Sequence, residues 1–406
     1  MNNKIKVAVL KETKTPSDKR AALSPKQAVR FLQHFPNTEL YIQSSDIRAF
    51  KDEEYSELGL TVTDDVSHCD ILIGIKEVEI SELIPEKTYM FFSHTAKKQA
   101  YNRKLLQTLL EKKIKMIDYE YLTYENGIRI IAFGRWAGMV GAYNGLRAFG
   151  KREGRFQLPQ AIQTQGMEAM FAELRKKVKL PPVKLLITGG GRVAQGALET
   201  LSVLNIKGVK PKDFLSKHYD SPVYSQLDPG DYVKRKDGKP FELQHFFENP
   251  EAYESAFTPY TKVADMYIAC HFWDEKSPKF ITKEDVEADD FKIRIIADVS
   301  CDINGPIAPT IRASEIADPF YGYEPKTHKE GYPFDRFNIS VMAVDNLPGE
   351  VPRDASEDFA TNLIDKIMPA LLGEDTEGII SRAIITENGE LGEHFRYLAD
   401  FAAGKE

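Results

Sequence analysis

The sequence predicts an α/β protein built from two Rossmann-like, doubly wound domains with a cleft between them. Three observations lead to this fold class. Strand-like and helix-like runs alternate along the first third of the chain, which favours a parallel sheet. Near the middle, a glycine-rich loop follows a strand-like run and precedes a helix-like one. Roughly 180 residues precede this loop, so they must form a second domain rather than the first half of a nucleotide-binding domain.

The first domain is expected to hold short strands with helices between several of them. Apolar runs of strand length lie at residues 4–10, 39–43, 70–76, 88–93, 115–119 and 128–133. A helix is predicted to begin after Ser24, which can cap it, with Pro25 in its first turn and Gln27 completing a capping box. Residues 97–112 also have a helix-like pattern. This alternation is typical of a doubly wound sheet.

The glycine-rich loop has the pattern G-x-G-x-x-A. Gly189 allows a tight turn, Gly191 lets the backbone approach a pyrophosphate, and Ala194 permits close packing of helix on strand. Arg192 and Val193 complete the start of the helix, where backbone N–H groups would hold the phosphates. The loop therefore predicts a bound dinucleotide.

The second domain is expected to begin near the small, apolar run at residues 133–141, which suits a helix packed closely where two domains meet. Its strands are predicted at residues 183–188, 223–227, 265–271 and 293–300, with an irregular insertion at 228–262. After a strand at 339–344 and a turn at 345–349, a helix at 356–372 would rejoin the first domain. We therefore predict a substrate-binding, catalytic domain of residues 1–138 and 345–406, and a dinucleotide-binding domain of residues 139–344.

The composition excludes some classes of partner. A net charge of −7 leaves no basic footprint for nucleic acid or an anionic membrane, and no apolar run is long enough to span a bilayer. Cys69, Cys270 and Cys301 lie far apart and favour a reduced compartment, and a strand-like run begins almost at once, without a targeting segment. We expect a cytoplasmic protein with small-molecule partners. No metal is predicted, because the neighbours His68 and Cys69 would point to opposite faces of a strand.

Charged residues gather just after several predicted strands. They are Lys14, Arg20, Lys76, His94, Lys97 and Glu120. Ligands in open α/β sheets bind at the carboxyl ends of strands, so these residues are site candidates. Several cations around one histidine suit a substrate with multiple carboxylates, for which arginine is a natural bidentate clamp. From position alone, a surface lysine paired with Glu77 and a structural histidine are the simpler interpretations of Lys76 and His94.

A series of sequence blocks spread over nearly the whole chain adds a further signal. The blocks are residues 12–14 (ETK), 20–25 (RAALSP), 87–95 (KTYMFFSHT), 117–120 (IDYE), 132–138 (AFGRWAG), 298–302 (DVSCD), 344–348 (VDNLP) and 383–389 (AIITENG). In this order they resemble the lysine-ketoglutarate reductase type of saccharopine dehydrogenase, which belongs to the wider alanine dehydrogenase and transhydrogenase superfamily. Several blocks in the same order indicate more than any one of them alone.

The resemblance implies an activity and roles for residues. Enzymes of this family join the ε-amine of lysine to 2-oxoglutarate through an imine, which hydride from a nicotinamide cofactor reduces to saccharopine. Lys76 and His94 match the family's acid–base pair, Arg20 and Lys97 match positions near substrate carboxylates, and Glu120 matches a carboxylate beside the pair.

The chemistry of such a reaction agrees with these residue types. Imine formation and hydrolysis need proton transfers near neutral pH, which suits histidine, with its ordinary pKa of about 6.5. Lysine starts near a pKa of about 10.4, so Lys76 serves as a base only if burial or cationic neighbours lower it. Asp345 either lines the cleft or caps the following turn. Asp302 either approaches the nicotinamide ribose or forms a structural turn.

The choice of cofactor stays open at this point. The second strand of the dinucleotide domain is predicted at residues 223–227 and ends in Asp228, which favours NAD, provided that residues 207–222 form an insertion before the strand. Asp213 has a more usual spacing from the loop but lies in a poor strand. The resembled enzymes use NADPH, which implies a basic residue, and Arg192 would suit NADP.

Two other functions remain possible from the sequence. One is an alanine dehydrogenase-like amino-acid dehydrogenase with the same Lys76 and His94 but a smaller substrate. The other is a nucleotide-sensing homologue without turnover, which the joint presence of Lys76, His94 and Arg20 opposes. Oligomeric state, physiological direction and the exact oxo acid and amine do not follow from the sequence.

Overall fold

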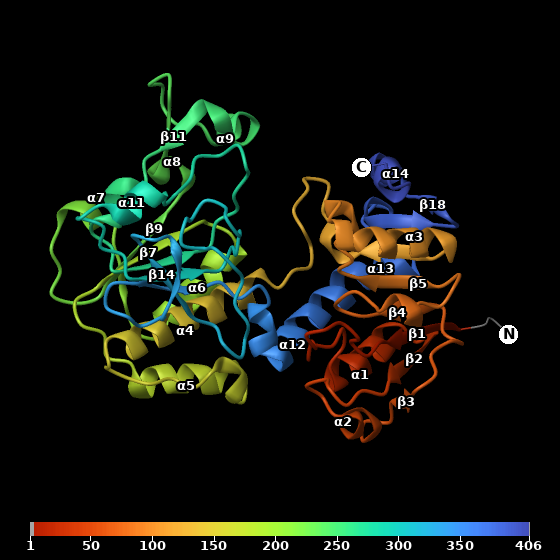
Figure 1. Ribbon diagram of the computed structural model, residues 1–406. Coiled ribbons are helices and arrows are strands. Elements are labelled where there is room, and N and C mark those ends of the chain that lie inside the picture. Colours follow the sequence, from red (N-terminus) through yellow and green to blue (C-terminus); the bar gives the residue numbers. More distant parts are fainter. Residues whose placement is uncertain (1–3, 406) are drawn as a thin grey trace. The chain divides into compact units, whose positions relative to one another are not determined.

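The structure is a computed structural model that describes residues 4–405, and the chain forms two compact units (Figure 1). Unit 1 comprises Met1–Phe133 and Pro352–Glu406, and unit 2 comprises Gly134–Val351. In Figure 1 the red N-terminal segment and the dark blue C-terminal segment lie in the same unit, because the chain returns to unit 1 after completing unit 2.

Unit 1 is built around an eight-stranded sheet in the order β18-β17-β6-β5-β4-β1-β2-β3. The strands are β1 (Ile5–Val9), β2 (Thr38–Gln43), β3 (Thr61–Thr63), β4 (Ile71–Ile73), β5 (Thr88–Phe91), β6 (Lys115–Asp118), β17 (Ile384–Glu387) and β18 (Glu390–Leu391). Strands β1 to β6 are parallel, and from β3 to β6 they have the order of a dinucleotide-binding Rossmann fold. The strands β17 and β18 add an antiparallel edge beside β6.

The helices of unit 1 come from both ends of the chain. They are α1 (Pro25–His34), α2 (Asp52–Ser56), α3 (Arg103–Glu111), α12 (Pro352–Asn362), α13 (Met368–Leu372) and α14 (Ala399–Ala402), with a π-helical stretch at Leu363–Ile367 between α12 and α13. The predicted cap of α1 is confirmed, since the Ser24 hydroxyl accepts a hydrogen bond from the Gln27 amide at 3.2 Å. The Ala21 amide donates to the Ser356 hydroxyl at 2.9 Å and so ties the two chain segments together.

Unit 2 has a second eight-stranded sheet, in the order β15-β14-β16-β13-β12-β7-β9-β8. The strands are β7 (Lys184–Thr188), β8 (Lys207–Gly208), β9 (Val223–Leu227), β12 (Met266–Ala269), β13 (Ile295–Asp298), β14 (Tyr321–Glu324), β15 (Lys329–Gly331) and β16 (Ile339–Met342). The six strands from β8 to β16 in this order are parallel, and β14 and β15 are antiparallel. The predicted insertion contains a two-stranded ribbon of β10 (Val233–Arg235) and β11 (Tyr253–Ser255).

Two helices of unit 2 pack against each other through glycines. The helices of this unit are α4 (Gly134–Arg152), α5 (Met167–Lys177), α6 (Arg192–Ser202), α7 (Pro211–Ser216), α8 (Pro229–Tyr232), α9 (Leu243–Glu248), α10 (Thr258–Thr261) and α11 (Lys283–Glu287). A side chain at Gly138 on α4 would overlap the Val193 carbonyl oxygen, and one at Gly196 on α6 would overlap the Arg135 carbonyl oxygen. The predicted close packing of the small, apolar run therefore occurs inside unit 2.

The bounds of the two units differ from the predicted domain limits at both crossings. The chain enters unit 2 at Gly134 rather than after residue 138, because α4 is one continuous helix that packs on α6 from its first turn. It leaves unit 2 after Val351 rather than before residue 345. The Asn144 side chain donates to Glu350 at 2.7 Å, which holds the segment after β16 against α4.

Two predicted elements of unit 1 are corrected by the structure. The strand predicted at residues 128–133 is wrong, since this segment contributes only an isolated bridge between Thr123 and Arg129. A strand at these residues would have to pair with the edge of β6, but β17 already pairs there. Because β17 lies at least 266 residues after β6 in the sequence, no local pattern indicates this pairing. The helix predicted from residue 97 begins later, at Arg103, after two short 3-10 turns.

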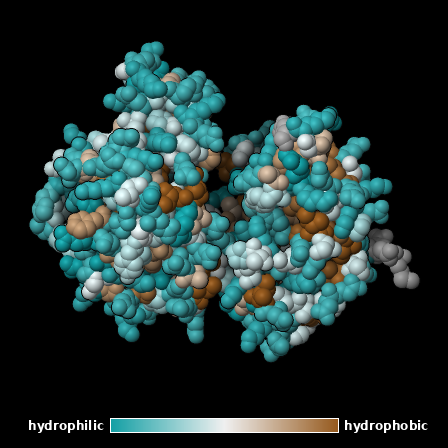
Figure 2. All heavy atoms as spheres, viewed as in Figure 1, coloured by the Kyte–Doolittle hydropathy of each residue, from teal (hydrophilic) through white to brown (hydrophobic). Residues whose placement is uncertain are grey.

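The surface of the molecule is mostly polar. In the view of Figure 2 hydrophilic residues cover most of each unit, and hydrophobic residues gather in limited patches. This agrees with a chain in which 28% of the residues are charged. No helix within residues 4–405 has both the length and the apolar character needed to cross a membrane.

Candidate active site

The carboxyl ends of β1, β4, β5 and β6 lie at one edge of the unit 1 sheet, since these strands are parallel neighbours or next neighbours. The charged residues predicted from the sequence follow these strands and interact with one another. Glu77, after β4, contacts the Lys14 ammonium at 2.7 Å and the His94 Nδ1 at 2.9 Å. The structure therefore brings the ends of β1, β4 and β5 together in one cluster.

Glu77 orients the imidazole of His94. Burial acts to raise the pKa of the Glu77 carboxyl, but the hydrogen bonds from His94 and Lys14 outweigh it and lower the pKa to about 2. A permanent carboxylate at Nδ1 fixes the ring and leaves Nε2 as the nitrogen that can exchange a proton with a ligand. The sequence suggested Glu77 only as a surface partner of Lys76, whereas its partners are Lys14 and His94.

The backbone of His94 is held in an unusual conformation. Its φ of 53° lies in the left-handed region, which residues other than glycine adopt uncommonly. The carboxylate of Asp118 accepts hydrogen bonds from the Ser93 amide at 2.9 Å and the Ser93 hydroxyl at 2.6 Å. Asn102 donates to the His94 carbonyl oxygen at 3.2 Å. These bonds hold the turn that presents the imidazole.

Lys76 is a partly buried lysine that follows β4. Burial lowers the pKa of its ammonium, and the charge of Arg20 lowers it further, against Asp18, which raises it. Within residues 4–405 the ammonium forms no hydrogen bond or ion pair. The main chain of Lys76 is fixed instead, because its amide donates to the Glu12 carboxyl at 2.8 Å.

Arg20, which the resemblance places near the substrate carboxylates, is already paired with a carboxylate of the protein. Its side chain is only 3% exposed, and its guanidinium forms a two-pronged ion pair with Asp18. The same group lies 4.2 Å from the centre of the Phe133 ring. Because the guanidinium of Arg20 is engaged by Asp18, Arg20 acts on the cluster mainly through its charge. This charge lowers the pKa of Lys76.

Glu120 is surrounded by cations. Its carboxylate pairs with Lys97 at 3.3 Å and with Arg129, a residue that the sequence did not single out. Burial acts to raise the pKa of Glu120, but Arg129 and Lys97 together lower it. One carboxylate oxygen, Oε2, is buried without a hydrogen-bond partner within residues 4–405. The half-exposed Lys97 and Arg129 are suited to bind carboxylates.

A pocket of about 700 Å³ adjoins the cluster within unit 1. Lys14 and Glu77 form part of its lining, together with the hydroxyl groups of Thr13 and Ser81 and the amide of Asn102. A ligand in this pocket would reach the Lys14 and Glu77 side of the cluster.

The glycine loop of unit 2 has the geometry expected of a phosphate-binding turn. Gly189 has a φ of 95°, and a side chain there would meet the Cys270 carbonyl oxygen at 2.5 Å, so only glycine fits. Gly191 caps the 11-residue helix α6, and a side chain built on it would meet no atom within 4 Å. The space over the helix N-terminus is therefore open, and Arg192 and Val193 follow in the first turn of α6. These residues fit a dinucleotide pyrophosphate.

The carboxylate of Asp228 lies beside this loop. Asp228 directly follows β9, which pairs with β7 as the next strand of the sheet, and its Oδ1 would lie 3.3 Å from a side chain built on Gly190. The long spacing is explained by β8 and α7, which are inserted before β9. Asp213 lies in α7 and so does not end a strand. An acidic residue in the position of Asp228 suits a ribose hydroxyl.

Two further predicted residues, Asp302 and Asp345, both lie in unit 2. Burial raises the pKa of Asp302 to about 6, with a contribution from the neighbouring Asp298. Asp345 is exposed and follows β16, so it belongs to unit 2 rather than to the first domain as predicted. Burial raises the pKa of the Cys301 thiol, and the nearby carboxylates of Asp345 and Asp302 raise it further.

No candidate metal site is present in the described part of the chain. Within residues 4–405 there is no group of three or more His, Cys, Asp and Glu side chains that could hold a metal ion. The predicted geometry of His68 and Cys69 is corrected, since they precede β4 in a loop and their side chains approach to 3.8 Å. Cys69, Cys270 and Cys301 are all free.

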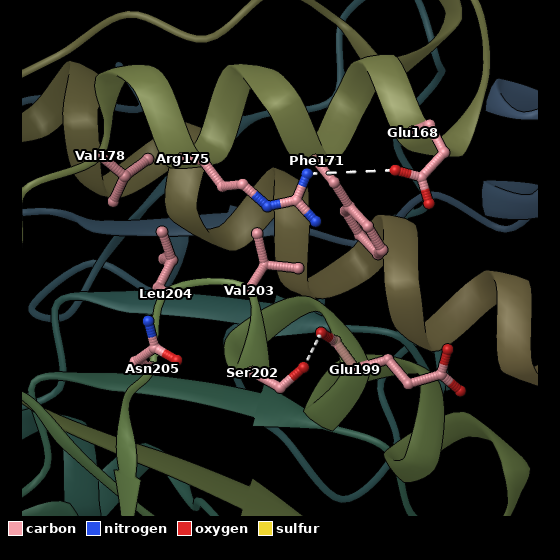
Figure 3. Close-up of a pocket in the computed structure, with 9 residues that line it drawn as sticks. All are labelled: Glu168, Phe171, Arg175, Val178, Glu199, Ser202, Val203, Leu204 and Asn205. Carbon is pink, nitrogen blue, oxygen red and sulfur yellow. Dashed lines mark hydrogen bonds and ion pairs between the residues drawn. The ribbon is translucent and has the colours of Figure 1, made fainter.

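Figure 3 shows a different pocket, also of about 700 Å³, between α5 and the end of α6. Arg175 and Glu168 approach to 4.0 Å on α5, and Ser202 and Asn205 line the opposite wall. The glycine loop lies at the N-terminal end of α6, whereas this pocket lies at its C-terminal end. None of the site residues predicted from the sequence lines it.

Known proteins resemble this chain at several levels. Residues 8–140 match the family model for "Alanine dehydrogenase/PNT, N-terminal domain". The whole chain is 27% identical to the mitochondrial alpha-aminoadipic semialdehyde synthase of Bos taurus and covers 49% of it. The chain is 28% identical to the saccharopine dehydrogenase (NAD(+), L-lysine-forming) of Candida albicans, over 92% of this chain and 93% of that protein. It spans 41–49% of the length of the alpha-aminoadipic semialdehyde synthases that it matches.

The fold has a counterpart among solved structures. An L-alanine dehydrogenase aligns with a TM-score of 0.68 and 15% identity, over 99% of this chain and 100% of the other. The L-alanine dehydrogenase structure shows the fold class, and residues 8–140 are similar to the N-terminal domain of the alanine dehydrogenase/PNT family. Within that class it is a homologue, over most of its length, of lysine-forming saccharopine dehydrogenases. The predicted α/β fold with two Rossmann-like domains and the predicted resemblance are confirmed.

Proposed function

We propose that this protein is an oxidoreductase that interconverts saccharopine with L-lysine and 2-oxoglutarate by hydride transfer to or from NAD. One observation carries the proposal. At neighbouring strand ends of unit 1, Lys76, whose pKa burial and Arg20 lower, lies in the same cluster as His94, whose ring Glu77 orients. The names of the relatives support the same substrates and cofactor.

The reaction requires several proton transfers on the nitrogen and oxygen atoms that are attached to one carbon. The ε-amine of lysine adds to the C2 carbonyl of 2-oxoglutarate, water leaves, and the resulting imine is reduced to the secondary amine of saccharopine. Lys76, with its lowered pKa, accepts the proton that the lysine ammonium must lose before it attacks. His94 donates a proton from Nε2 to the departing hydroxyl, while Glu77 stabilises the charged ring. In the other direction the same two groups return these protons as water hydrolyses the imine.

Binding of the substrates follows from the charges around the cluster. Lys97 and Arg129, which are about half exposed, would bind substrate carboxylates, and Lys14 would bind another from the pocket beside Glu77. The carboxylate of Glu120, which already attracts Lys97 and Arg129, would bind the substrate amine. Arg20 contributes through its charge on Lys76 rather than as a clamp.

The cofactor would be held by unit 2. A nicotinamide dinucleotide supplies or accepts the hydride. Its pyrophosphate would lie over Gly189, Gly191 and the first turn of α6, and Asp228 would bind the adenine ribose. Asp302 would face the nicotinamide ribose, and Asp345 lies near the same residue, Cys301. Asp228 favours NAD, and Arg192 is the residue that would instead accept a 2′-phosphate. Both units are needed, because the proton-transfer groups and the hydride carrier belong to different units.

Initial rates with different substrate pairs test the proposal. Lysine with 2-oxoglutarate should support oxidation of NADH, and NADPH should give a kcat/KM at least about 10-fold lower. Pyruvate with ammonia serves as the comparison pair. Turnover with that pair alone would assign an alanine dehydrogenase-like activity, and binding of NADH without turnover on either pair would assign a nucleotide-sensing role.

The cellular setting belongs to the same proposal. The partners are small molecules, namely lysine, 2-oxoglutarate and saccharopine. A cytoplasmic location is supported by the three free cysteines, which form no disulfide among themselves.

A further inference from the structure

Glu12 lies at the carboxyl end of β1, in the middle of the unit 1 sheet. It follows β1 by three residues, and β1 lies next to β4, although the chain forms β2 and β3 between them. Neighbouring strands that are separated in this way mark the topological switch point, where the connections leave on opposite faces and a crevice opens. Glu12 thus stands where the sheet opens toward the cluster of Lys76 and His94.

The carboxyl group of Glu12 replaces the backbone of β1 after that strand has ended. The ladder between the two strands closes with the Leu10 amide, which donates to the Ile73 carbonyl oxygen at 2.8 Å. Beyond it, the Ile75 amide donates to Glu12 Oε1 at 2.7 Å and the Lys76 amide donates to Oε2 at 2.8 Å. On the other side, the Phe92 amide donates to the Ile75 carbonyl oxygen at 3.0 Å. The segment that carries Lys76 is therefore held from both sides.

We propose that Glu12 is a positioning residue for Lys76, because its two oxygens fix the main chain at Ile75 and Lys76 and so set where the Lys76 ammonium lies. The inference rests on the proposed role of Lys76 as a base. Within residues 4–405 no side chain hydrogen-bonds the Lys76 ammonium, so its position depends on its main chain. Glu12 is only 7% exposed, and burial keeps its own rotamer fixed.

The pKa of the Glu12 carboxyl is set by effects that oppose one another. Burial raises the pKa of its carboxyl to about 8, against the backbone hydrogen bonds from Lys76 and Ile75. The charged and titratable groups that face it are Asp18, which raises the pKa, Arg20, which lowers it, and Tyr119, whose own pKa burial and Glu12 raise. Glu12 and Lys76 thus share Asp18 and Arg20 as electrostatic neighbours.

The variant Glu12→Gln tests this role in the full chain. The amide keeps the size of the side chain but replaces one acceptor oxygen by a donor, so one of the two backbone amides loses its bond. Asp375→Asn is the matched control, because Asp375 accepts bonds from the consecutive amides of Ile380 at 3.1 Å and Ser381 at 2.8 Å in the same unit. Asp375 is not among the residues of the proposed site.

Two measurements follow, and the first is kinetic. With lysine, 2-oxoglutarate and NADH, Glu12→Gln should lower kcat about 10- to 100-fold, leave the KM for NADH within about 2-fold, and shift the pH profile of kcat. Asp375→Asn should change none of these. An equal loss in both variants, or a loss in Glu12→Gln without any change in the pH profile, would make Glu12 merely structural. If Glu12→Gln does not fold, Glu12→Asp, which keeps the carboxyl group but is shorter, replaces it, with an expected loss of about 3- to 10-fold.

The second measurement does not depend on turnover. Lysines are labelled by reductive methylation with ¹³C, which keeps their charge, and the Lys76 signal is assigned by its loss in Lys76→Arg. Its titration midpoint should move by at least about half a pH unit in Glu12→Gln and stay unchanged in Asp375→Asn. An unchanged midpoint in Glu12→Gln would overturn the proposal. Absence of turnover in the wild-type chain would overturn the proposed function instead, and the titration would still decide the role of Glu12.

Discussion

Carboxylates at the strand ends of unit 1 decide how Lys76 and His94 are presented. Glu77 stays ionised and orients the imidazole, since its pKa is held at about 2. Asp118 holds the turn before His94 and also accepts a hydrogen bond from the Glu120 amide at 2.8 Å. Glu12 holds the main chain of Lys76. Each acid thus acts on a group that is distant in sequence.

Loss of either proposed proton-transfer group should abolish turnover while the fold is kept. Lys76→Met and His94→Gln should each lower kcat with lysine and 2-oxoglutarate by about 10²- to 10⁴-fold, the range expected for an acid–base group. Circular dichroism checks that the fold is intact. Lys26→Met, at an exposed position on α1, is the control and should retain full activity. Turnover within about 3-fold of wild type in Lys76→Met would remove Lys76 from the mechanism.

His271 should make unit 2 sensitive to acid. It is 6% exposed, its Nδ1 is hydrogen-bonded to the Thr188 hydroxyl at 2.8 Å, and burial lowers its pKa to about 3. In the unfolded chain the pKa returns to about 6.5, so between pH 6.5 and 3 the unfolded state binds the extra proton. The free energy of unfolding should therefore fall as the pH falls through this window, by up to about 1.4 kcal/mol per pH unit.

Urea unfolding between pH 7 and pH 4 measures this effect. His271→Gln should flatten the pH dependence, although the lost bond to Thr188 lowers stability at pH 7. His218→Gln, at a position whose side chain is 89% exposed, should leave the slope as it is in wild type. The same slope in His271→Gln and wild type would contradict the prediction.

Among the elements, those that are local in sequence could be predicted and those that depend on distant pairing could not. The capped helix after Ser24 and the strand leading to Gly189 carry their signals within a few residues. By contrast, β17 pairs with β6 across most of the chain, and no local pattern indicated that it excludes a strand at residues 128–133. The start of α4 at Gly134 depends on its packing against α6, which is likewise a tertiary effect.

The same distinction applies to the candidate site. Lys76, His94 and Glu120 could be found because they follow strands and lie in resembled sequence blocks. The role of Glu12 could not be predicted, although it lies in such a block, because its hydrogen-bond partners are 63 and 64 residues away in the sequence. Arg129 lies in a loop without a periodic pattern. The pairing of Arg20 with Asp18, only two residues apart, was readable in principle, since opposite charges at this spacing in a loop can pair.

Two glycines of unit 2 should respond oppositely to the same substitution. Gly138→Ala forces a methyl group into the Val193 carbonyl oxygen between α4 and α6, and should lower the free energy of unfolding by about 1–3 kcal/mol. Gly191→Ala meets open space in the protein, so stability should change by less than about 1 kcal/mol. The affinity for NADH should nevertheless fall at least about 10-fold, because the methyl group enters the space for the pyrophosphate.

Thermal unfolding and NADH titration of the two variants check this contrast. The result expected is a lower Tm without a comparable loss of affinity for Gly138→Ala, and a lower affinity without a lower Tm for Gly191→Ala. Unchanged NADH binding in Gly191→Ala would mean that the loop does not hold the dinucleotide.

At the scale of the whole molecule, unit 1 depends on the return of the chain after unit 2. The ring of Phe359 stacks on that of Phe133, with 4.9 Å between the ring centroids, and meets the Tyr119 ring edge-on at a centroid distance of 5.0 Å. The Thr386 hydroxyl donates a hydrogen bond to the Ile114 carbonyl oxygen at 2.8 Å. Residues 352–406 thus complete the core and one edge of the unit 1 sheet. Unit 2 is continuous in sequence.

A chain that ends at Val351 should therefore lose unit 1 and keep unit 2. Limited proteolysis should cleave readily within residues 4–133 and leave residues 134–351 protected, because the aromatic contacts of Phe359 and the partner of β6 are missing. Adding NADH should raise the Tm of the protected part. Equal protection of residues 4–133 in the shortened and the full chain would contradict this view of unit 1.

The central claim is that unit 1 supplies the proton-transfer groups and unit 2 the hydride carrier of one reaction that forms saccharopine. The most direct measurement is the amount of saccharopine formed per NADH oxidised, by mass spectrometry and absorbance in the same sample, from lysine and 2-oxoglutarate. The account predicts one saccharopine formed per NADH oxidised in the wild-type chain. In Lys76→Met it predicts neither formation of saccharopine nor oxidation of NADH. Oxidation of NADH without saccharopine, or saccharopine formed equally by Lys76→Met, would contradict it.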